Sequence, residues 1–319
     1  MHRRAMLLGA SAIAVSSLAI PAVARAAAPA AGSLGAPFMR YRVGDFEITA
    51  FNDGTRAVGN PEKIFGIDRK PEDVAAAAEA NFLPSDRMVN GFTPVLVNTG
   101  RELVLFDSGN GAGGRPATGQ LAHQMKAAGV APDEIDVVVI THCHPDHIGG
   151  LMDEGRPLAP NARYVIGETE YRFWSSPDRA GGPTANAARL VQSNVVPLED
   201  RMTFVKDDGE VVSGIRAVEA FGHTPGHMAW HVESAGKRLF IGADFCNHYV
   251  LSLRHPRWHV SFDADKDQAV ATRLRLLDML SAERLPFTSY HMPFPAVGFV
   301  EKGADGGYRF VAASYQLML

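Results

Sequence analysis

The chain has 319 residues, of which 46% are hydrophobic and 21% are charged. These fractions are near the averages of soluble globular proteins, so a large core is available and a disordered chain is excluded. The formal net charge of −4 leaves no basic excess, and since no nucleic-acid-reading motif accompanies it, we expect no nucleic-acid partner. The length alone permits one large domain or two smaller ones.

The N-terminal segment has the three regions of a secretory signal in the required order. A basic start with Arg3 and Arg4 precedes an apolar stretch, and Ala24-Arg25-Ala26 matches a cleavage site with small residues. The arginine pair is also similar to a twin-arginine export signal. We therefore expect residues 1–26 to be removed and residues 27–319 to reach the periplasm or be secreted, with no membrane span left. A retained N-terminal anchor is the alternative.

Strand patterns dominate the next part of the chain. Residues 41–55 alternate apolar and polar side chains and end in Asn-Asp-Gly, which predicts one strand leading into a turn. Residues 93–109 hold two apolar runs around a glycine-containing turn, which predicts a hairpin ending at Asp107. Helical spacing over residues 117–129 then leads to the buried strand IDVVVITH.

The second half of the chain repeats this mixture of strands and helices. The same patterns predict strands at 162–166 and 214–221, a hairpin made by 228–234 and 236–245, and helices at 168–174 and 265–283. Both halves contain a strand that ends near an aspartate, Asp107 in one and Asp244 in the other, which indicates a weak internal similarity. No linker or change of composition separates the halves, so we expect one domain.

Directly after the buried strand, the motif HCHPDH places three histidines and an aspartate within residues 142–147. Histidine clusters also occur on solvated loops and at core edges, but imidazole and carboxylate groups are ligands for divalent cations. Four ligands so close in sequence cannot all reach one tetrahedral ion from an extended loop. Alternation turns His142 and His144 the same way, whereas a tight turn at Pro145 redirects the residues that follow, so two centres form more easily.

This H-x-H-x-D-H pattern resembles the signature of the metallo-β-lactamase-fold hydrolase superfamily. Further landmarks of that family lie on either side of it: Asp107 in LFDSG, His223 in GHTPGH, Asp244 in IGADF and His291 in SYHMPFP. Within the superfamily, the chain is most similar to the exported methyl parathion hydrolase group and related lactonases, through GDFEITAFNDGT, LVNTG, HTPGH and GYRFV. The resemblance implies an α/β fold, the αββα sandwich of this superfamily, in a single domain over residues 27–319.

The resemblance also implies two divalent ions held by seven ligands. One ion would be held by His142, His144 and His223, the other by Asp146, His147 and His291, with Asp244 as the bridge between them. Zinc is the ion we expect for nitrogen and oxygen ligands of this kind, with manganese or iron as alternatives.

Three carboxylates would have further roles by the same resemblance. Asp146 and Asp244 would be the catalytic residues. Asp107 would orient a ligand imidazole from behind, since the second ring nitrogen of a ligand histidine needs a partner. A turn or capping aspartate is the alternative for Asp107.

Two divalent ions about 3.5–4 Å apart can share a water, lower its pKa and direct the resulting hydroxide at an electrophile. The resemblance therefore implies that a metal-bridging hydroxide cleaves a neutral ester, without a Ser or Cys nucleophile. We expect a lactone, such as an acyl-homoserine lactone, ahead of an aryl phosphotriester of the methyl parathion kind. An exported metal-binding protein without enzymatic activity would use the same ligands and is the third alternative. The sequence also leaves a homodimer open.

Five aromatic residues are candidates for the apolar wall of a substrate pocket, with a place in the core as the alternative for each. They are Phe173, Trp174, Tyr249, Trp258 and Phe294. The two cysteines, Cys143 and Cys246, each lie beside an expected ligand. We expect two unpaired thiols, and a disulfide between them is the alternative.

Overall fold

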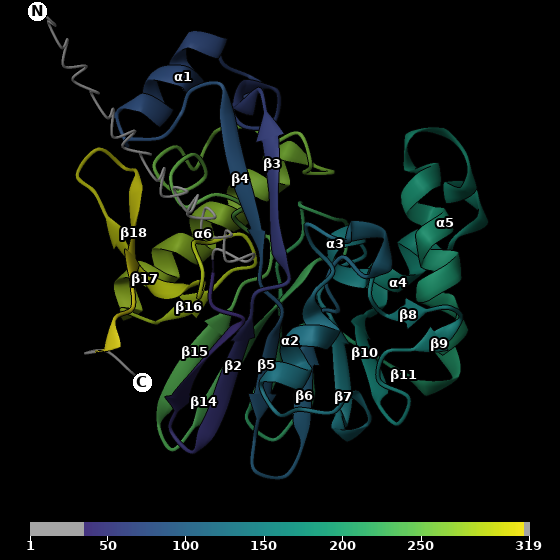
Figure 1. Ribbon diagram of the computed structural model, residues 1–319. Coiled ribbons are helices and arrows are strands. Elements are labelled where there is room, and N and C mark those ends of the chain that lie inside the picture. The colour runs from purple at the N-terminus through teal and green to yellow at the C-terminus, as the bar shows by residue number, and fades with distance from the viewer. Residues whose placement is uncertain (1–34, 316–319) are drawn as a thin grey trace, which may run out of the picture. The chain divides into compact units, whose positions relative to one another are not determined.

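The computed structural model describes residues 35–315 (Figure 1). The expected export signal, residues 1–26, lies outside the described residues. From Gly35 the chain clusters into one compact unit. No helix within residues 35–315 combines the length and the apolar character that a membrane crossing requires.

Two seven-stranded sheets form the centre of this unit. The strand order of the first sheet is β1 (Phe38–Val43), β2 (Phe46–Phe51), β5 (Val95–Asn98), β6 (Leu103–Phe106), β7 (Val137–Ile140), β10 (Arg163–Gly167) and β11 (Met202–Val205). The order of the second is β12 (Glu210–Val212), β13 (Ile215–Glu219), β14 (Met228–Ser234), β15 (Lys237–Ile241), β16 (Phe287–Thr288), β17 (Val297–Lys302) and β18 (Tyr308–Ala312).

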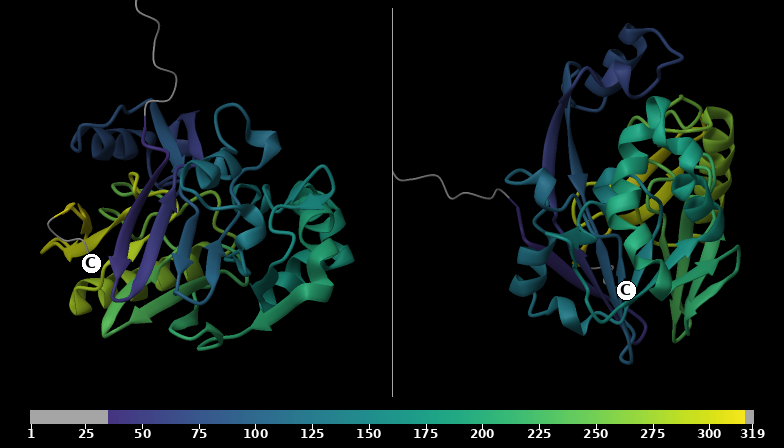
Figure 2. Two further views of the ribbon diagram at one scale, coloured as in Figure 1. Left: turned by 60° about the horizontal axis from the view of Figure 1, so that its bottom comes forward. Right: turned by 90° about the vertical axis from the view of Figure 1, so that its right-hand side faces the viewer.

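The alternation of side chains along the strands explains how the layers pack. On β7, Val137 and Val139 belong to the core between the sheets, whereas Val138 and Ile140 belong to a second core on the outer face. Successive side chains point to opposite faces, so a strand that is apolar throughout must be covered on both. Helices provide this cover: α2 (Leu121–Ala127), α4 (Glu168–Ser175) and α5 (Ala185–Asn194) on the first sheet, and α6 (Lys266–Glu283) on the second. The expected αββα sandwich is confirmed (Figure 2).

A separate antiparallel strand pair interrupts the first sheet in sequence. β3 (Gly54–Gly59) pairs with β4 (Arg87–Phe92), and the chain between them forms η1 (Pro61–Lys63) and α1 (Pro71–Glu79). We call residues 54–92 the arm. In Figure 1 the arm extends beyond the end of the first sheet, with α1 at its far end. The arm was not among the elements expected from the sequence.

The remaining short elements connect these layers. They are η2 (Ala112–Gly114), η3 (Pro132–Glu134), α3 (Pro145–Ile148), β8 (Met152–Asp153), β9 (Arg156–Pro157), η4 (Pro177–Ala180), η5 (Gly182–Thr184) and η6 (Val196–Arg201).

Most predicted elements are confirmed. The hairpin at 93–109 is β5 with β6, the hairpin at 228–245 is β14 with β15, and the predicted helices correspond to α2, α4 and α6. The single strand expected over 41–55 is wrong, because the chain turns between β1 and β2 at Gly44, whose φ is 58°. A Cβ at Gly44 would lie 2.1 Å from the carbonyl oxygen of Ser234, so this turn excludes a side chain on steric grounds as well.

Candidate metal centre

The expected ligands lie just beyond the carboxyl ends of strands in both sheets. β6 runs parallel to β7, and β15 runs parallel to β16, so within each sheet these neighbours end at the same edge. From the first sheet, His142 and His144 follow β7, and α3 then carries Asp146 and His147. From the second sheet, His223 follows β13, Asp244 follows β15 and His291 follows β16. The fold therefore brings all seven residues to one place.

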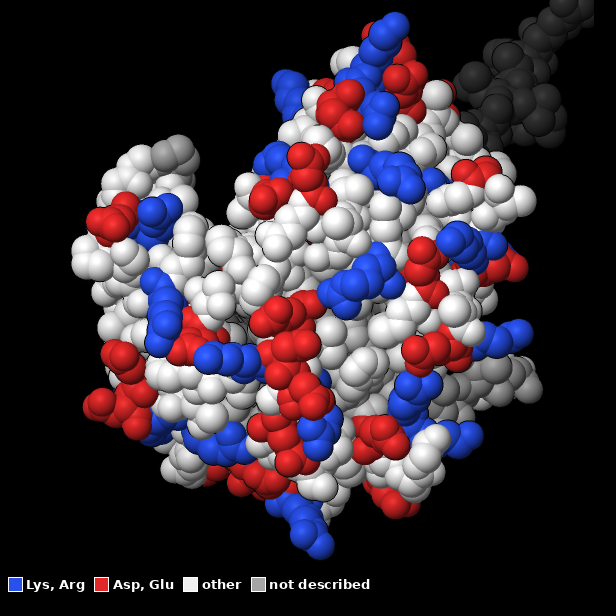
Figure 3. Space-filling model, turned by 180° about the vertical axis from the view of Figure 1, so that it is seen from behind, with Lys and Arg blue, Asp and Glu red and all other residues white. Residues whose placement is uncertain are grey.

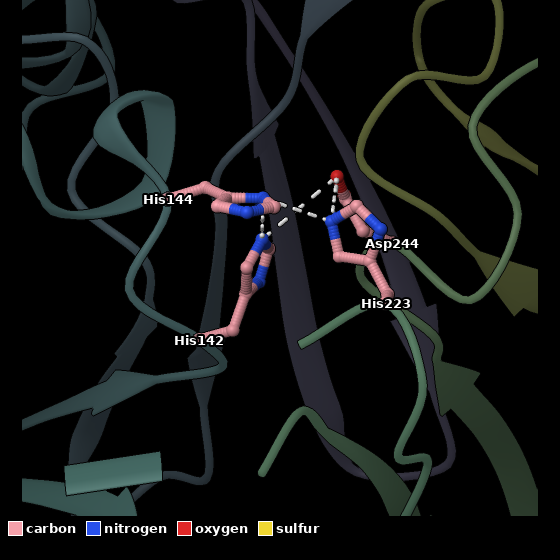
Figure 4. Close-up of side chains that lie close together, drawn as sticks. All are labelled: His142, His144, His223 and Asp244. Carbon is pink, nitrogen blue, oxygen red and sulfur yellow. Dashed lines mark hydrogen bonds and ion pairs between the residues drawn. The ribbon is translucent and has the colours of Figure 1, made fainter. Parts of the chain in front are cut away.

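His142, His144 and His223 form what we call the three-histidine group (Figure 4). Nδ1 of His144 lies 3.1 Å from Nε2 of His142 and 2.9 Å from Nε2 of His223. With Zn–N bonds of about 2.0–2.1 Å, two ligand atoms of a tetrahedral zinc ion are roughly 3.3 Å apart. These nitrogens are therefore spaced for one shared ion, and a carboxylate oxygen of Asp244 lies within 4.8 Å of each of them.

Asp146, His147 and His291 form a second cluster, which we call the aspartate group. Oδ2 of Asp146 lies 3.5 Å from Nε2 of His147 and 3.4 Å from Nε2 of His291.

Asp244 lies between the two groups. Its Oδ1 is 3.4 Å from Nε2 of His147, and its Oδ2 is 3.1 Å from Nε2 of His291. The same Oδ2 is 3.4 Å from Nε2 of His223 in the three-histidine group. This is the position that a carboxylate shared by two ions would occupy.

The side chains present fit a pair of divalent cations. Nε2 of His147 and Oδ1 of Asp244 are buried and have no hydrogen-bond partner. Native proteins rarely leave buried polar atoms unpaired, and a cation would satisfy both lone pairs. Five imidazoles with two carboxylates are also a donor set that suits zinc and neighbouring divalent metals.

Four of the ligand imidazoles have a hydrogen-bond partner on their outer side. The hydroxyl oxygen of Thr141 accepts from Nδ1 of His142 at 3.1 Å. Asp107 accepts from Nδ1 of His147 at 2.7 Å, as expected from the sequence, and also from Thr141. Asp263 accepts from Nδ1 of His223 at 2.8 Å. The backbone carbonyl of Gly91, on the arm, lies 2.9 Å from Nδ1 of His291. With Nδ1 donating outward in each case, the lone pair of Nε2 faces the centre. No sequence pattern predicted the roles of Asp263 and Gly91.

A fully buried carboxylate joins the loops that carry His144 and His223. Glu170 on α4 accepts hydrogen bonds from the backbone N–H of Cys143 at 2.8 Å and of Gly226 at 2.9 Å. It also accepts from the Trp174 indole and the Thr224 hydroxyl, both at 2.8 Å. Glu170 is 0% exposed. Because water does not reach this carboxylate, the four donors around it depend on Glu170 as their hydrogen-bond acceptor. No sequence pattern distinguished Glu170 as part of the site.

Burial and charge move the pKa values of these histidines in opposite directions. Burial, together with the neighbouring histidines, lowers the pKa of His142, and burial lowers that of His144 to about 3. Burial would also lower the pKa of His147, but Asp244, Asp107 and Asp146 raise it well above its ordinary value. The neutral imidazoles are ready to bind a cation, whereas a charged imidazole must first lose a proton.

Both cysteines are free and buried. The expectation of two unpaired thiols is therefore confirmed. Cys143 lies between two residues of the ligand motif, where its backbone rather than its thiol contacts Glu170.

A cavity of about 520 Å³ lies against both ligand groups. Its remaining wall comes from the arm, from η2 and α3 with the loop residues beside them, from α5 and from the loop before α6. The lining residues outside the ligand cluster are Arg56, Val58, Asn90, Phe92, Asn110, Gly113, Gly114, Pro145, Gly149, Leu190 and Phe262. Figure 3 shows the surface hollowed between the lobe that carries α5, at the left, and the rest of the molecule, with charged side chains of both signs interspersed around it.

None of the five aromatic residues expected in the wall lines this cavity. Trp174 is 5% exposed and packs in the core between α4 and the first sheet, and Phe173 packs against that core. Trp258 stacks on His255, Tyr249 stacks on His248, and Phe294 packs against the core between the sheets. The expectation for these residues is wrong, because they pack in or against other parts of the protein, and the large apolar side chains that line the cavity are instead Phe92 on the arm, Leu190 and Phe262.

Residues 93–286 match the family model of the metallo-beta-lactamase superfamily. The match covers more than half of the chain, so the chain belongs to this superfamily. It includes every residue of the two ligand groups except His291, and it includes Asp244.

Among curated proteins, the chain is similar to N-acyl homoserine lactonase AiiA of Bacillus thuringiensis subsp. kurstaki, with 23% identity over 151 residues. That match covers 44% of this chain and 54% of the lactonase. It is also similar to atrochrysone carboxyl ACP thioesterase dmxR1 of Cryptosporiopsis sp. (strain 8999), with 27% identity over 172 residues, 54% of this chain and 44% of the thioesterase. The chain thus spans about half the length of the curated relatives it matches.

Among solved structures, the chain resembles AidC, a dizinc quorum-quenching lactonase in complex with a product. The TM-score is 0.80 at 25% identity, over 87% of this chain and 98% of AidC. It resembles the hydrolase AbOPH with a TM-score of 0.81 at 24% identity, over 89% of this chain and 99% of AbOPH. The second likeness concerns the fold alone.

Proposed function

We propose that the protein is a metal-dependent hydrolase of neutral esters, with lactones, including acyl-homoserine lactones, as its first substrate class. The observation that carries the proposal is the gathering of five imidazoles and two carboxylates on one side of a cavity of about 520 Å³. Small-molecule sites commonly have volumes of about 300–1,000 Å³. The likeness to a dizinc lactonase over most of the chain supports the lactone class.

Two divalent ions, zinc in this proposal, would supply Lewis-acid activation of water and of the ester carbonyl when bound. The residues of the chain hold and orient this chemistry. Asp244 is shared between the two groups, while Asp107 and Asp263 fix the orientation of His147 and His223. Asp146 has 22% of its side chain exposed and lines the cavity, so we assign its carboxylate the transfer of a proton during ester cleavage.

The decisive test is turnover by purified protein loaded with two equivalents of zinc. A panel of lactones and an aryl phosphotriester, compared by kcat/KM, should give its largest values with lactones. Larger values with the phosphotriester would replace lactones with the alternative substrate class. Turnover of neither class, with zinc tightly bound, would favour a metal-binding protein without this activity. Parallel loading with manganese or iron tests the metal.

We also propose that the protein is exported and loses residues 1–26. The order of basic, apolar and small residues in this segment supports export. Mass spectrometry of protein from the cell envelope should give a chain beginning at Ala27. An intact Met1 in that fraction would favour a retained anchor.

A further inference from the structure

One face of the arm forms part of the cavity wall beside the ligands. In the β3–β4 pair, Arg56 faces Asn90, and two residues further along each strand are Val58 and Phe92. Side chains separated by two positions, and those of directly paired residues, lie on the same face of a sheet. All four residues line the cavity, whereas Val89 on the other face is 63% exposed. The arm therefore contributes a continuous surface to the substrate site.

Arg56 is the cationic side chain in this wall. Its Nη2 lies 3.4 Å from Oδ1 of Asn110, and its guanidinium carbon lies 5.8 Å from the centre of the Phe92 ring. Asn110 is itself held by Asp53, which accepts from its Nδ2 at 3.0 Å. The guanidinium thus has a preferred place in the cavity, although it remains exposed. Among residues 35–315, no carboxylate lies within ion-pair distance of Arg56.

The position of this charge relative to the ligand cluster is set by the strand that pairs with it. The backbone carbonyl of Gly91 lies 2.9 Å from Nδ1 of His291, and the Phe92 ring meets the His291 ring edge-on at 5.4 Å. Leu190 and Phe262 add apolar surface to the same cavity. A ligand would therefore meet metal-binding side chains, apolar side chains and a guanidinium in one cavity.

We propose that the arm forms a subsite for a carboxylate, so that the preferred substrate is a lactone whose acyl chain ends in an anionic group. The proposal rests on the proposed ester hydrolysis. A guanidinium with free donors can form two parallel N–H···O hydrogen bonds to the oxygens of a carboxylate, which a neutral end group cannot match. The amide of Asn90, directly across from Arg56, is a further donor for the same group.

The test uses matched homoserine lactones acylated by adipic or suberic acid. One member of each pair has a free terminal carboxylate, and the other has the neutral carboxamide of nearly the same shape. With zinc-loaded protein in low salt, we expect kcat/KM to favour the carboxylate by about five- to ten-fold, a modest ratio because Arg56 is exposed. Raising the salt from about 20 mM to about 500 mM should reduce this ratio.

Variants assign the preference to Arg56. Arg56→Gln should bring the carboxylate-to-carboxamide ratio close to one, whereas Arg56→Lys should keep part of it. Arg42→Gln, at an exposed position on β1 outside the cavity, makes the same charge change and should leave the ratio unaltered. Thermal melting of each variant checks that it is folded.

The outcomes separate this inference from the proposed function. Equal or better turnover of the carboxamides by the parent protein overturns the subsite, and so does a ratio that Arg56→Gln leaves unchanged. If Arg56→Gln does not fold, a ratio that is insensitive to salt and to Arg56→Lys overturns it. In all these cases the lactone activity stands. Failure to hydrolyse either member of any pair, or any simple lactone, overturns the proposed function itself.

Discussion

The two ligand groups differ in what holds them in place. In the three-histidine group, Asp263 braces His223 and is itself paired at 2.9 Å with the fully buried Arg273. Arg273 also donates to the backbone carbonyls of Phe245, Pro256 and Trp258, which holds the loop before α6. Behind the same group, Glu170 accepts four hydrogen bonds, three from the loops on either side and one from the Trp174 indole on its own helix.

The aspartate group has fewer charged supports. Asp107 braces His147, but His291 lies against a backbone carbonyl of the arm. Asp146 has 22% of its side chain exposed, whereas the side chain of His147 in the same group is 0% exposed. Its backbone carbonyl accepts from the Tyr290 hydroxyl at 2.7 Å.

This difference indicates separate tasks for the two groups. The three-histidine group depends on buried side chains from both halves of the sandwich, so it should keep its ion firmly. The aspartate group is tied to the arm, which also forms the substrate wall. Substitutions in the arm that change substrate recognition should therefore affect metal binding at the aspartate group before they affect it at the three-histidine group.

The largest effect is expected from Asp244→Ala, because this change removes the one carboxylate that both groups share. We expect affinity for both ions to fall by more than about 100-fold, beyond the usual cost of losing an indirect support, and lactone turnover to fall with it. Elemental analysis after dialysis measures the metal content. Asp200→Ala, at an exposed site in η6, is the control. A variant that keeps two ions would show that Asp244 is not shared.

Asp263→Asn and Asp107→Asn separate the two groups. Each removes one carboxylate that orients an imidazole, which typically weakens metal binding by about 10–100-fold. Asp263→Asn should weaken the ion of the three-histidine group and Asp107→Asn that of the aspartate group. Asp107 has a φ of 63°, a region that asparagine tolerates, so the second change adds little backbone strain.

Stepwise titration of these two metal-free variants with Co²⁺, followed by visible absorption, gives the two affinities separately. If both variants weaken the same ion, the division into two independently braced groups is wrong.

Glu170→Gln tests the buried support behind the three-histidine group. The amide nitrogen of the glutamine is a donor and cannot accept hydrogen bonds from the N–H and O–H groups that it faces. We therefore expect about ten-fold weaker binding of the ion at the three-histidine group and a loss of stability of about 2–3 kcal/mol. Trp174→Phe is the matched comparison, because it removes one of the four hydrogen bonds and should cost about 1 kcal/mol without changing metal content. It should also leave the preference between long and short lactones unchanged, since Trp174 does not line the cavity. Equal metal loss in both variants would assign the effect to packing.

The smallest effect concerns pH. The lowered pKa values of His142 and His144 keep both neutral at pH 7, while His223, with its pKa raised to about 9, must lose a proton. Although burial opposes it, nearby carboxylates raise the pKa of His147 well above its ordinary value and also raise that of His291, so both hold a proton to a higher pH than a free imidazole does. Binding of a metal ion at the aspartate group should therefore release more protons than binding at the three-histidine group.

Its affinity should consequently fall more steeply as the pH drops from about 8 to about 6, by up to about ten-fold per pH unit for each proton released. Calorimetry in two buffers with different ionisation enthalpies counts the protons. Equal release at both groups would contradict the assigned charge states.

The sequence predicted the fold and the ligand cluster because their signals are local. Strand alternation and helical spacing depend on neighbours within a few positions, and the motif at 142–147 places four donors on one short segment after a buried strand. The later ligands were found by their resemblance to family landmarks. Asp107 was found in the same way, at the end of a strand that runs parallel to β7.

Only the tertiary structure decided what surrounds these ligands. Asp263 and Glu170 are ordinary acidic residues in sequence, and nothing local distinguishes them from solvated ones until the chain brings them beside His223 and Cys143. The aromatic residues expected in the pocket wall are apolar, and apolarity alone does not distinguish a core position from a cavity wall. The wall came instead from the arm, whose position against His291 depends on a backbone carbonyl at Gly91 that carries no side-chain signal.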